Sequence, residues 1–165
     1  MSANGLKKIS GFVILVLIQV LVLNKVNIFG YATPFLYIYL IVSLGISTPR
    51  WQGLLIGFAL GLCIDFFTHT PGINASATVL LAFLQPVFLR LFAPRDSDET
   101  LCPTMNQLGL MSFLKYALLC VLVHHTMLFM LEYFTYVGLV QTLLKIGGST
   151  VLTISLIVAV DKMTD

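Results

Sequence analysis

Apolar stretches of helix length alternate with short polar breaks along the whole chain. They predict helices over residues 9–24, 33–48, 52–68, 73–93, 107–134 and 138–161. A helix needs about 20 mostly apolar residues to cross a bilayer, and the first three stretches reach that length only by extending into their flanks. Glycine and proline stand at nearly every break, as turns require. The pattern therefore predicts an all-α bundle of six transmembrane helices, forming one membrane domain over residues 1–165.

The composition supports a membrane protein and argues against a soluble one. Of 165 residues, 58% are hydrophobic and 10% are charged, whereas about a quarter of the residues in an average soluble domain are charged. A soluble fold of this composition would expose large apolar patches. The net charge of +2 is too small to indicate nucleic-acid binding. We therefore expect the lipid bilayer as a partner and no nucleic acid.

The distribution of cations predicts an orientation, because cytoplasmic loops carry an excess of Lys and Arg. With a cytoplasmic N-terminus, two cations fall at outer helix ends, Lys25 and Lys145. The other seven of the nine then fall at cytoplasmic ends: Lys7, Lys8, Arg50, Arg90, Arg95, Lys115 and Lys162. The sequence therefore predicts a multi-pass protein with both termini in the cytoplasm.

Three glycines and a carboxylate share one register in the predicted third helix. Gly53, Gly57, Gly61 and Asp65 follow one another at four-residue spacing, which places them on one helix face. Within a bilayer no hydrophobic force drives helices together, and close approach through small residues does so instead. Two interpretations stay open. The face packs against another helix of the same bundle, or it docks a partner helix.

Ionisable residues gather in the outer halves of three predicted helices: Asp65, His124, His125, Glu132 and Lys145. A charged residue inside a membrane usually faces protein or water. One interpretation is a polar lock, in which Asp65 bonds one of the histidines and Glu132 lies near Lys145. The second is a proton or ion pathway, although the inner halves of these helices offer few polar residues. The third is a partner or ligand site that opens outward.

No motif indicates catalysis, a metal or a cofactor. His124 and His125 are adjacent, so their side chains point about 100° apart on a helix and cannot readily bind one ion together. The three cysteines match no zinc or redox spacing. The common hydrolase, metalloprotease and phosphate-loop motifs are missing from the sequence. We therefore predict a non-enzymatic protein without a metal or cofactor.

The first half of the chain resembles a known family. Its third-helix pattern is a glycine-spaced helix that ends in Asp65 and is followed by a Pro71–Gly72 turn, GLLIGFALGLCIDFFTHTPGINA. This pattern is similar to MreD, the rod shape-determining membrane proteins of bacteria. The stretches FGYATPFLYIYL and LLAFLQPVFLRLFAPRD are similar to the branch found in Bacteroidetes-type bacteria. The resemblance covers roughly residues 17–96, and the second half matches only in length and topology.

The resemblance implies a scaffold in the bacterial inner membrane. MreD-like proteins act in the cell-elongation machinery that maintains cell shape and inserts side-wall peptidoglycan. They associate with MreC, which has a single membrane helix and a periplasmic domain. Through it they connect to the actin homologue MreB and to the RodA glycosyltransferase with its penicillin-binding partner. Their fold is similar to the substrate-binding subunit of energy-coupling-factor transporters, and the family is not known as an enzyme.

The resemblance also suggests which residues matter. Partner-binding or helix-packing roles are expected for Gly53, Gly57, Gly61, Asp65, Pro71 and Gly72. We expect the small-residue face to let helices approach closely. We expect Asp65 to pin the outer end of the third helix and the turn over residues 69–74. Together these features would shape an outer surface for an MreC-like helix.

A small-molecule-binding membrane subunit, of the kind found in vitamin transporters, is the alternative function. It requires a polar, aromatic-lined pocket that opens outward. Tyr31, Tyr37 and Tyr39, together with the outer ionisable residues, are the candidate lining. A third class, an ion-coupled transporter, would require a polar path to the cytoplasm.

Overall fold

The fold comes from a computed structural model, which describes residues 3–26, 32–94, 101–133 and 138–164. Within these ranges the regular secondary structure is helical, without strands. The five long helices are α1 (Ala3–Leu21), α3 (Arg50–Thr68), α4 (Ile73–Phe92), α6 (Leu110–Tyr133) and α7 (Leu139–Thr164). The short helices are η1 (Leu23–Lys25), η2 (Leu36–Ile38), α2 (Tyr39–Val42) and α5 (Met105–Leu108).

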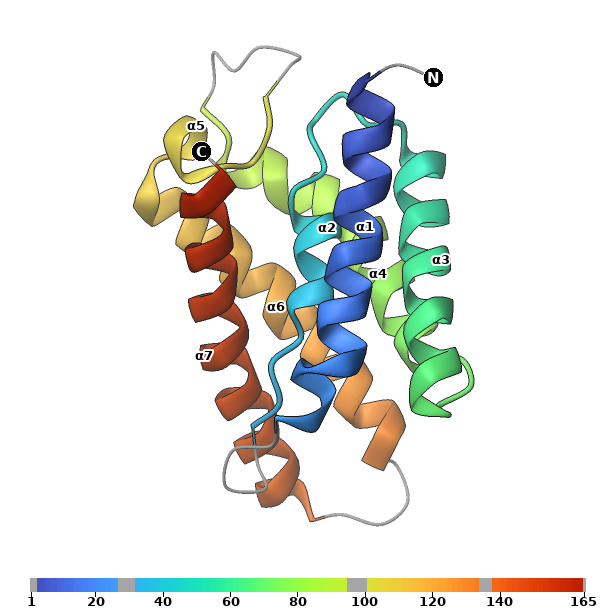
Figure 1. Ribbon diagram of the computed structural model, residues 1–165. Helices are drawn as coiled ribbons and strands as arrows, with labels where there is room; N and C mark the ends of the chain where they lie inside the picture. The colour runs from blue at the N-terminus through green and yellow to red at the C-terminus, as the bar shows by residue number, and fades with distance from the viewer. Residues whose placement is uncertain (1–2, 27–31, 95–100, 134–137, 165) are drawn as a thin grey trace.

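The long helices lie side by side in a bundle, with both chain termini at the same end (Figure 1). We call the opposite end, where the turn between α3 and α4 lies, the distal end. Helices α3, α4, α6 and α7 are long and apolar enough to cross a membrane, and α1 and η1 contribute a shorter apolar helical stretch, Gly11–Lys25. These lengths indicate a multi-pass membrane protein. The common end of the termini fits the expectation that both lie on one side of the membrane, and which side stays a prediction.

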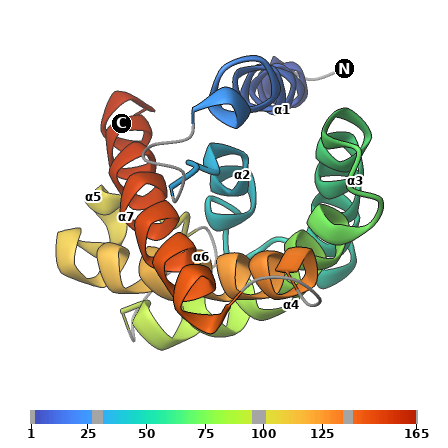
Figure 2. The same ribbon diagram turned by 90° about the horizontal axis from the view of Figure 1, so that it is seen from below.

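The predicted second transmembrane helix, over residues 33–48, is wrong. The chain has no helix up to Phe35, then forms η2 and α2, and turns after Val42. Pro34 favours an extended conformation at Thr33. Figure 2 shows α2 near the centre of the bundle, surrounded by α1, α3, α4, α6 and α7. A six-span bundle is therefore not what the structure shows.

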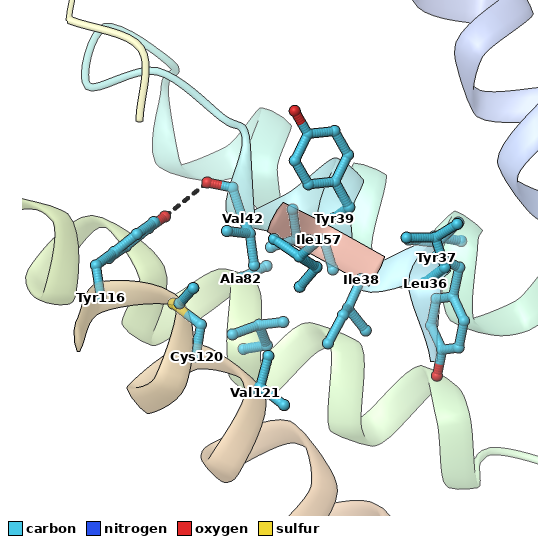
Figure 3. Packing of buried hydrophobic residues seen from close by; sticks show 14 of the residues in the cluster. Leu36, Tyr37, Ile38, Tyr39, Val42, Ala82, Tyr116, Cys120, Val121 and Ile157 are labelled. Carbon is cyan, nitrogen blue, oxygen red and sulfur yellow. Dashed lines mark hydrogen bonds between the residues drawn. The ribbon is translucent and has the colours of Figure 1, made fainter. Parts of the chain in front are cut away.

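The short central helices are apolar because protein surrounds them. Tyr37, Ile38, Ile41 and Val42 are fully buried. In Figure 3 the side chains of η2 and α2 lie among those of α4, α6 and α7, including Ala82, Cys120, Val121 and Ile157. A helix that is hydrophobic all round is buried in a core or in a membrane. Hydropathy alone does not distinguish a helix buried in a protein core from one buried in a membrane. Here η2 and α2 are buried in the protein core.

Side chains from other helices satisfy the irregular backbone before η2. The Gln19 side chain of α1 accepts hydrogen bonds from the Leu36 N–H at 2.8 Å and the Tyr37 N–H at 3.4 Å. Its amide donates to the Pro34 carbonyl at 2.9 Å. From α7, Ser149 accepts from the Thr33 N–H at 3.1 Å and Thr153 accepts from the Phe35 N–H at 3.0 Å. Non-helical backbone at membrane depth is tolerated only where protein or water satisfies it.

A second group of side chains satisfies the chain after α2. The Tyr116 hydroxyl of α6 donates to the Val42 carbonyl at 2.7 Å (Figure 3). The Gln85 amide of α4 donates to the Leu44 carbonyl at 2.9 Å and to the Tyr116 hydroxyl at 2.8 Å. The central segment, residues 33–44, is thus fixed at both ends by polar groups that come from four helices.

The glycine face of α3 packs against α4 of the same chain. A Cβ atom at Gly57 would lie 3.0 Å from the Ala82 Cβ and from the Thr78 carbonyl oxygen. One at Gly61 would overlap Ala75 and Thr78. Close helix approach through small residues is what this spacing predicts. The observed position agrees with packing inside the bundle and leaves these two glycines no room for a partner helix.

The remaining long helices match the predicted stretches, with different ends. The predicted helix over residues 107–134 is two helices, because Gly109, with φ of +77°, separates α5 from α6. The Thr104 side chain accepts from the Gln107 N–H and caps α5. Helix α1 begins earlier than predicted and α7 continues to Thr164.

Replacing Gln19 with Leu should destabilise the protein, because it removes three hydrogen bonds from the backbone of the central segment. Each buried group left unsatisfied costs about 1–3 kcal/mol, so we expect a clearly lower melting temperature in detergent. Gln52→Leu is the matched control, since Gln52 is exposed in the first turn of α3. Equal melting temperatures for the two variants would contradict the role given to Gln19.

Replacing Gly61 with Ala should destabilise the α3–α4 pair, because the added methyl group meets the backbone of Ala75. Overpacking of this kind costs about 1–3 kcal/mol. Gly53→Ala is the control, because a Cβ atom at Gly53 would lie 3.7 Å from its nearest neighbour, the Leu44 Cδ1 atom, which is an ordinary van der Waals contact. That variant should unfold at the wild-type temperature or slightly above it, since Ala favours helix. A Gly61→Ala protein as stable as Gly53→Ala would disprove the close approach.

Candidate functional site

The turn between α3 and α4 has an unusual backbone. His69 ends α3 in the left-handed region, with φ of 56°, and its N–H donates to the Asp65 carbonyl. Gly72 precedes α4 with φ of 84° and has no side chain to cap the helix. Glycine is the usual residue at positive φ, so His69 is strained relative to Gly72. Something else must hold the turn and the start of α4.

The Asp65 carboxylate holds them, and it is 5% exposed. One oxygen, Oδ2, accepts from the Gly72 N–H at 3.1 Å and the Ala75 N–H at 2.9 Å. The other, Oδ1, accepts from the Asn74 N–H at 2.9 Å, the Asn74 side-chain amide at 3.0 Å and the Thr70 hydroxyl at 3.0 Å. An anion at a helix N-terminus satisfies free N–H groups and is favoured by the helix dipole. Asp65 thus caps α4 from the preceding helix.

A chain of hydrogen bonds leads from Asp65 into the bundle. The Asn74 Oδ1 atom accepts from the Tyr37 hydroxyl at 2.9 Å, and this hydroxyl lies 3.0 Å from Nε2 of His124. The predicted direct bond from Asp65 to a histidine is therefore wrong, since Asn74 and Tyr37 stand between them. His125 bonds elsewhere, with its Nδ1 atom 3.4 Å from the Thr150 hydroxyl of α7.

Aromatic rings surround the two histidines. The Phe35 ring centroid lies 5.1 Å from that of His125 and 6.1 Å from that of His124. Phe129 stacks on His125 at 5.9 Å. Nδ1 of His124 and Nε2 of His125 have no hydrogen-bond partner among the described residues. The histidines thus belong to a buried aromatic cluster at the inner boundary of the site.

A cavity of about 240 Å³ opens at the distal end above this cluster, and we call it the distal cavity. Its polar lining comes from η1, the chain before η2, α3, the α3–α4 turn, α4, α6 and α7: Asn24, Thr33, Thr68, Thr70, Asn74, Glu132, Lys145 and Ser149. Its apolar lining is Phe35, Ile64, Ile73, Leu128 and Phe129. The structure therefore brings Glu132 and Lys145 to one cavity.

Two of the three tyrosines expected to line a pocket, Tyr37 and Tyr39, are not among the described residues that line this one. Tyr37 is fully buried and bonded to Asn74. Tyr39 donates from its hydroxyl to Asp161 at 3.0 Å, near the C-terminal end of α7. Tyr31 lies outside the described residues. The aromatic lining of the distal cavity comes instead from Phe35 and Phe129.

A second, shallower depression lies on the outer surface of the α3–α4 turn. We call it the turn hollow, and its lining is Leu62, Asp65, Phe66, Phe67, His69, Pro71 and Gly72. Phe66 is 76% exposed and Phe67 is 52% exposed. Three residues singled out by the family resemblance, Asp65, Pro71 and Gly72, thus lie together at this surface.

Sequence analysis missed several buried polar residues that hold the structure. Gln85, Ser149 and Thr153 bond the central segment. Asp161, which is 1% exposed, accepts from the Tyr39 hydroxyl and from the Met105 N–H at 2.8 Å. Their common signal is a polar residue within an apolar helix, where an unsatisfied group is costly.

No group of three His, Cys, Asp or Glu side chains in the described ranges is placed to hold a metal ion. The chain matches no family model, no curated protein and no solved structure in the comparisons with known proteins. The candidate sites among the described residues are the distal cavity and the turn hollow.

Replacing Asp65 should loosen the turn in a graded manner. Asn keeps one oxygen acceptor, whereas Leu keeps none, so we expect Asp65→Leu to lose more stability than Asp65→Asn. Hydrogen bonds to charged groups contribute about 1.5–3 kcal/mol each, and the loss should appear as a lower melting temperature and faster proteolysis at residues 69–72. Equal losses for Asn and Leu would show that the negative charge, and not the hydrogen bonds, holds the turn.

Proposed function

We propose that this chain is a non-enzymatic, MreD-like scaffold of the bacterial cell-elongation complex in the inner membrane. It would bind an MreC-like single-span protein and through it reach the MreB-like cytoskeleton and the RodA–penicillin-binding synthase. The observation that carries the proposal is the turn hollow. Three of the residues that the family resemblance singles out, Asp65, Pro71 and Gly72, meet there, and the Asp65 carboxylate bonds the backbone of the turn.

The α3–α4 pair is suited to the role of a rigid docking platform. Gly57 and Gly61 bring the two helices into close contact, and Asp65 ties the end of one to the start of the other. A surface that is already ordered loses little entropy when a partner binds. The partner therefore meets a preformed surface.

The exposed side of α3 offers a continuous apolar surface next to the turn hollow. Five large side chains lie on it at spacings of three and four residues: Trp51, Leu55, Phe58, Leu62 and Phe66. A single membrane helix that lies along α3 would cover this stripe. Its extension beyond the membrane would then meet Phe67, His69 and Pro71 at the turn.

Replacing Phe66 with Ala should reduce the amount of MreC-like protein that co-purifies in mild detergent. A large, central aromatic contact of an interface typically contributes 2 kcal/mol or more, so we expect a loss of about tenfold or more in apparent affinity. Val151→Ala is the matched control, because Val151 is similarly exposed on α7, away from α3. Undiminished binding by Phe66→Ala, at wild-type stability, would remove the turn hollow from the proposal.

A further inference from the structure

We propose that His124 acts as a proton sensor for the turn between α3 and α4, so that acid loosens the turn hollow. One chain of hydrogen bonds joins the sensor to the turn, through Tyr37, Asn74 and Asp65. The change in the turn is argued from these contacts alone. Its effect on a partner rests on the docking role proposed for the turn hollow.

The hydrogen bonds of this chain have a fixed direction. The Asp65 carboxylate is an acceptor, so the Asn74 side-chain amide, 3.0 Å away, donates to it through its nitrogen. The Asn74 side-chain oxygen therefore faces the Tyr37 hydroxyl, which donates its single hydrogen to it at 2.9 Å. The Nε2 atom of His124 lies 3.0 Å from the same hydroxyl and must then be a donor. Asp65 thus determines, through two residues, that His124 carries its hydrogen on Nε2.

The other ring nitrogen of His124, Nδ1, is where a further proton would bind. His124 is fully buried, and Nδ1 has no hydrogen-bond partner among the described residues. A proton there would create a donor without an acceptor and a positive charge among the rings of Phe35, Tyr37 and His125. Burying an unpaired donor or charge is costly. The closed bundle therefore favours neutral His124, and protonation favours an open form in which this side chain reaches water.

The surrounding titratable groups leave this nitrogen without a partner. Six of them face the histidines or the adjoining distal cavity: Tyr37 from η2, Asp65 from α3, Cys120, His125 and Glu132 from α6, and Lys145 from α7. The contribution of α4 is the neutral Asn74. Glu132 and Lys145 each have an interaction of their own. The carboxylate of Asp65 is linked to the Nε2 side of the ring, and its hydrogen bonds go to the turn and the start of α4.

Movement of His124 would break the chain at its inner end. Tyr37 would lose the hydrogen bond from Nε2, and Asn74 would lose a partner held in one position. Asn74 provides two of the hydrogen bonds that Asp65 accepts, one from its backbone and one from its side chain. Hydrogen bonds in a chain polarise and strengthen one another. Loss of the inner end therefore weakens the contacts by which Asp65 holds the turn.

Proton uptake sets the direction of the pH dependence. The open form binds a proton at Nδ1 and the closed form does not, so the ratio of open to closed protein rises as the pH falls. For one proton, this ratio changes by up to about tenfold per pH unit. Histidine is the side chain that ordinarily changes charge between about pH 5 and 8. The sequence contains three, His69, His124 and His125, so single variants can assign the response.

The test measures hydrogen exchange of the backbone N–H groups of residues 72–75 in full-length protein in lipid nanodiscs. Protection is compared at about pH 7.5 and about pH 5, relative to the intrinsic exchange rate at each pH. We expect wild-type protein to lose about tenfold or more of this protection in acid. His124→Gln should show no such loss, because its amide can donate to Tyr37 but does not take up a proton. His69→Gln is the control, since His69 is exposed at the turn itself, and it should respond like wild type.

A second measurement does not depend on the folding of a variant. Nitrogen-15 NMR of histidine-labelled wild-type protein at about pH 7.5 should show the hydrogen of His124 on Nε2. Hydrogen on Nδ1 would refute the direction of the chain and with it the sensor. Equal protection of the turn at both pH values would also refute the sensor, as would an acid response that persists in His124→Gln.

Partner binding separates this inference from the docking role. If acid loosens the turn through His124 and also weakens binding of the MreC-like protein, both proposals are supported. If acid loosens the turn and binding is unchanged, the sensor is supported and docking at the turn hollow is refuted.

Discussion

The fold depends on one constraint, the need to satisfy a non-helical backbone in the middle of a membrane bundle. The short helices between Thr33 and Leu44 leave several backbone groups of this segment without a partner in the segment itself, and at this depth no bulk water is available. Gln19, Ser149, Thr153, Gln85 and Tyr116 provide the missing partners. They come from α1, α7, α4 and α6, so the helices cannot shift without breaking these bonds. The central segment thus determines how the surrounding helices are arranged.

Asp65 applies the same principle at the distal end. Gly72 cannot cap α4, so a carboxylate from α3 accepts the free N–H groups instead. The glycines of α3 make this possible, because Gly57 and Gly61 allow the two helices to lie close enough for the Asp65 side chain to reach the start of α4. The shared register of the glycines and the carboxylate therefore has a structural reason: together they join α3 to α4.

The sequence predicts features that depend on local spacing and misses those that depend on long-range contacts. The small-residue face of α3 and the boundaries of α4 follow from residues three and four apart. The second predicted helix fails because residues 33–48 are equally apolar whether lipid or protein surrounds them. The role of Asn74, between Asp65 and Tyr37, depends on chain segments 37 residues apart, and no local pattern contains that information. The lining of the distal cavity is hidden for the same reason, since Asn24 and Glu132 meet only in the fold.

The distal cavity and the central segment have a common origin. A regular helix over residues 33–48 would carry its side chains along the full length of the bundle and fill the space among α3, α4, α6 and α7. The actual chain is not helical at Thr33 and Phe35, and both residues line the cavity. The hydrogen bonds that compensate for the missing helix also place Ser149 at the cavity wall. The irregular backbone thus requires several polar side chains as hydrogen-bond partners. It also leaves a cavity with a partly polar lining at the distal end of the bundle.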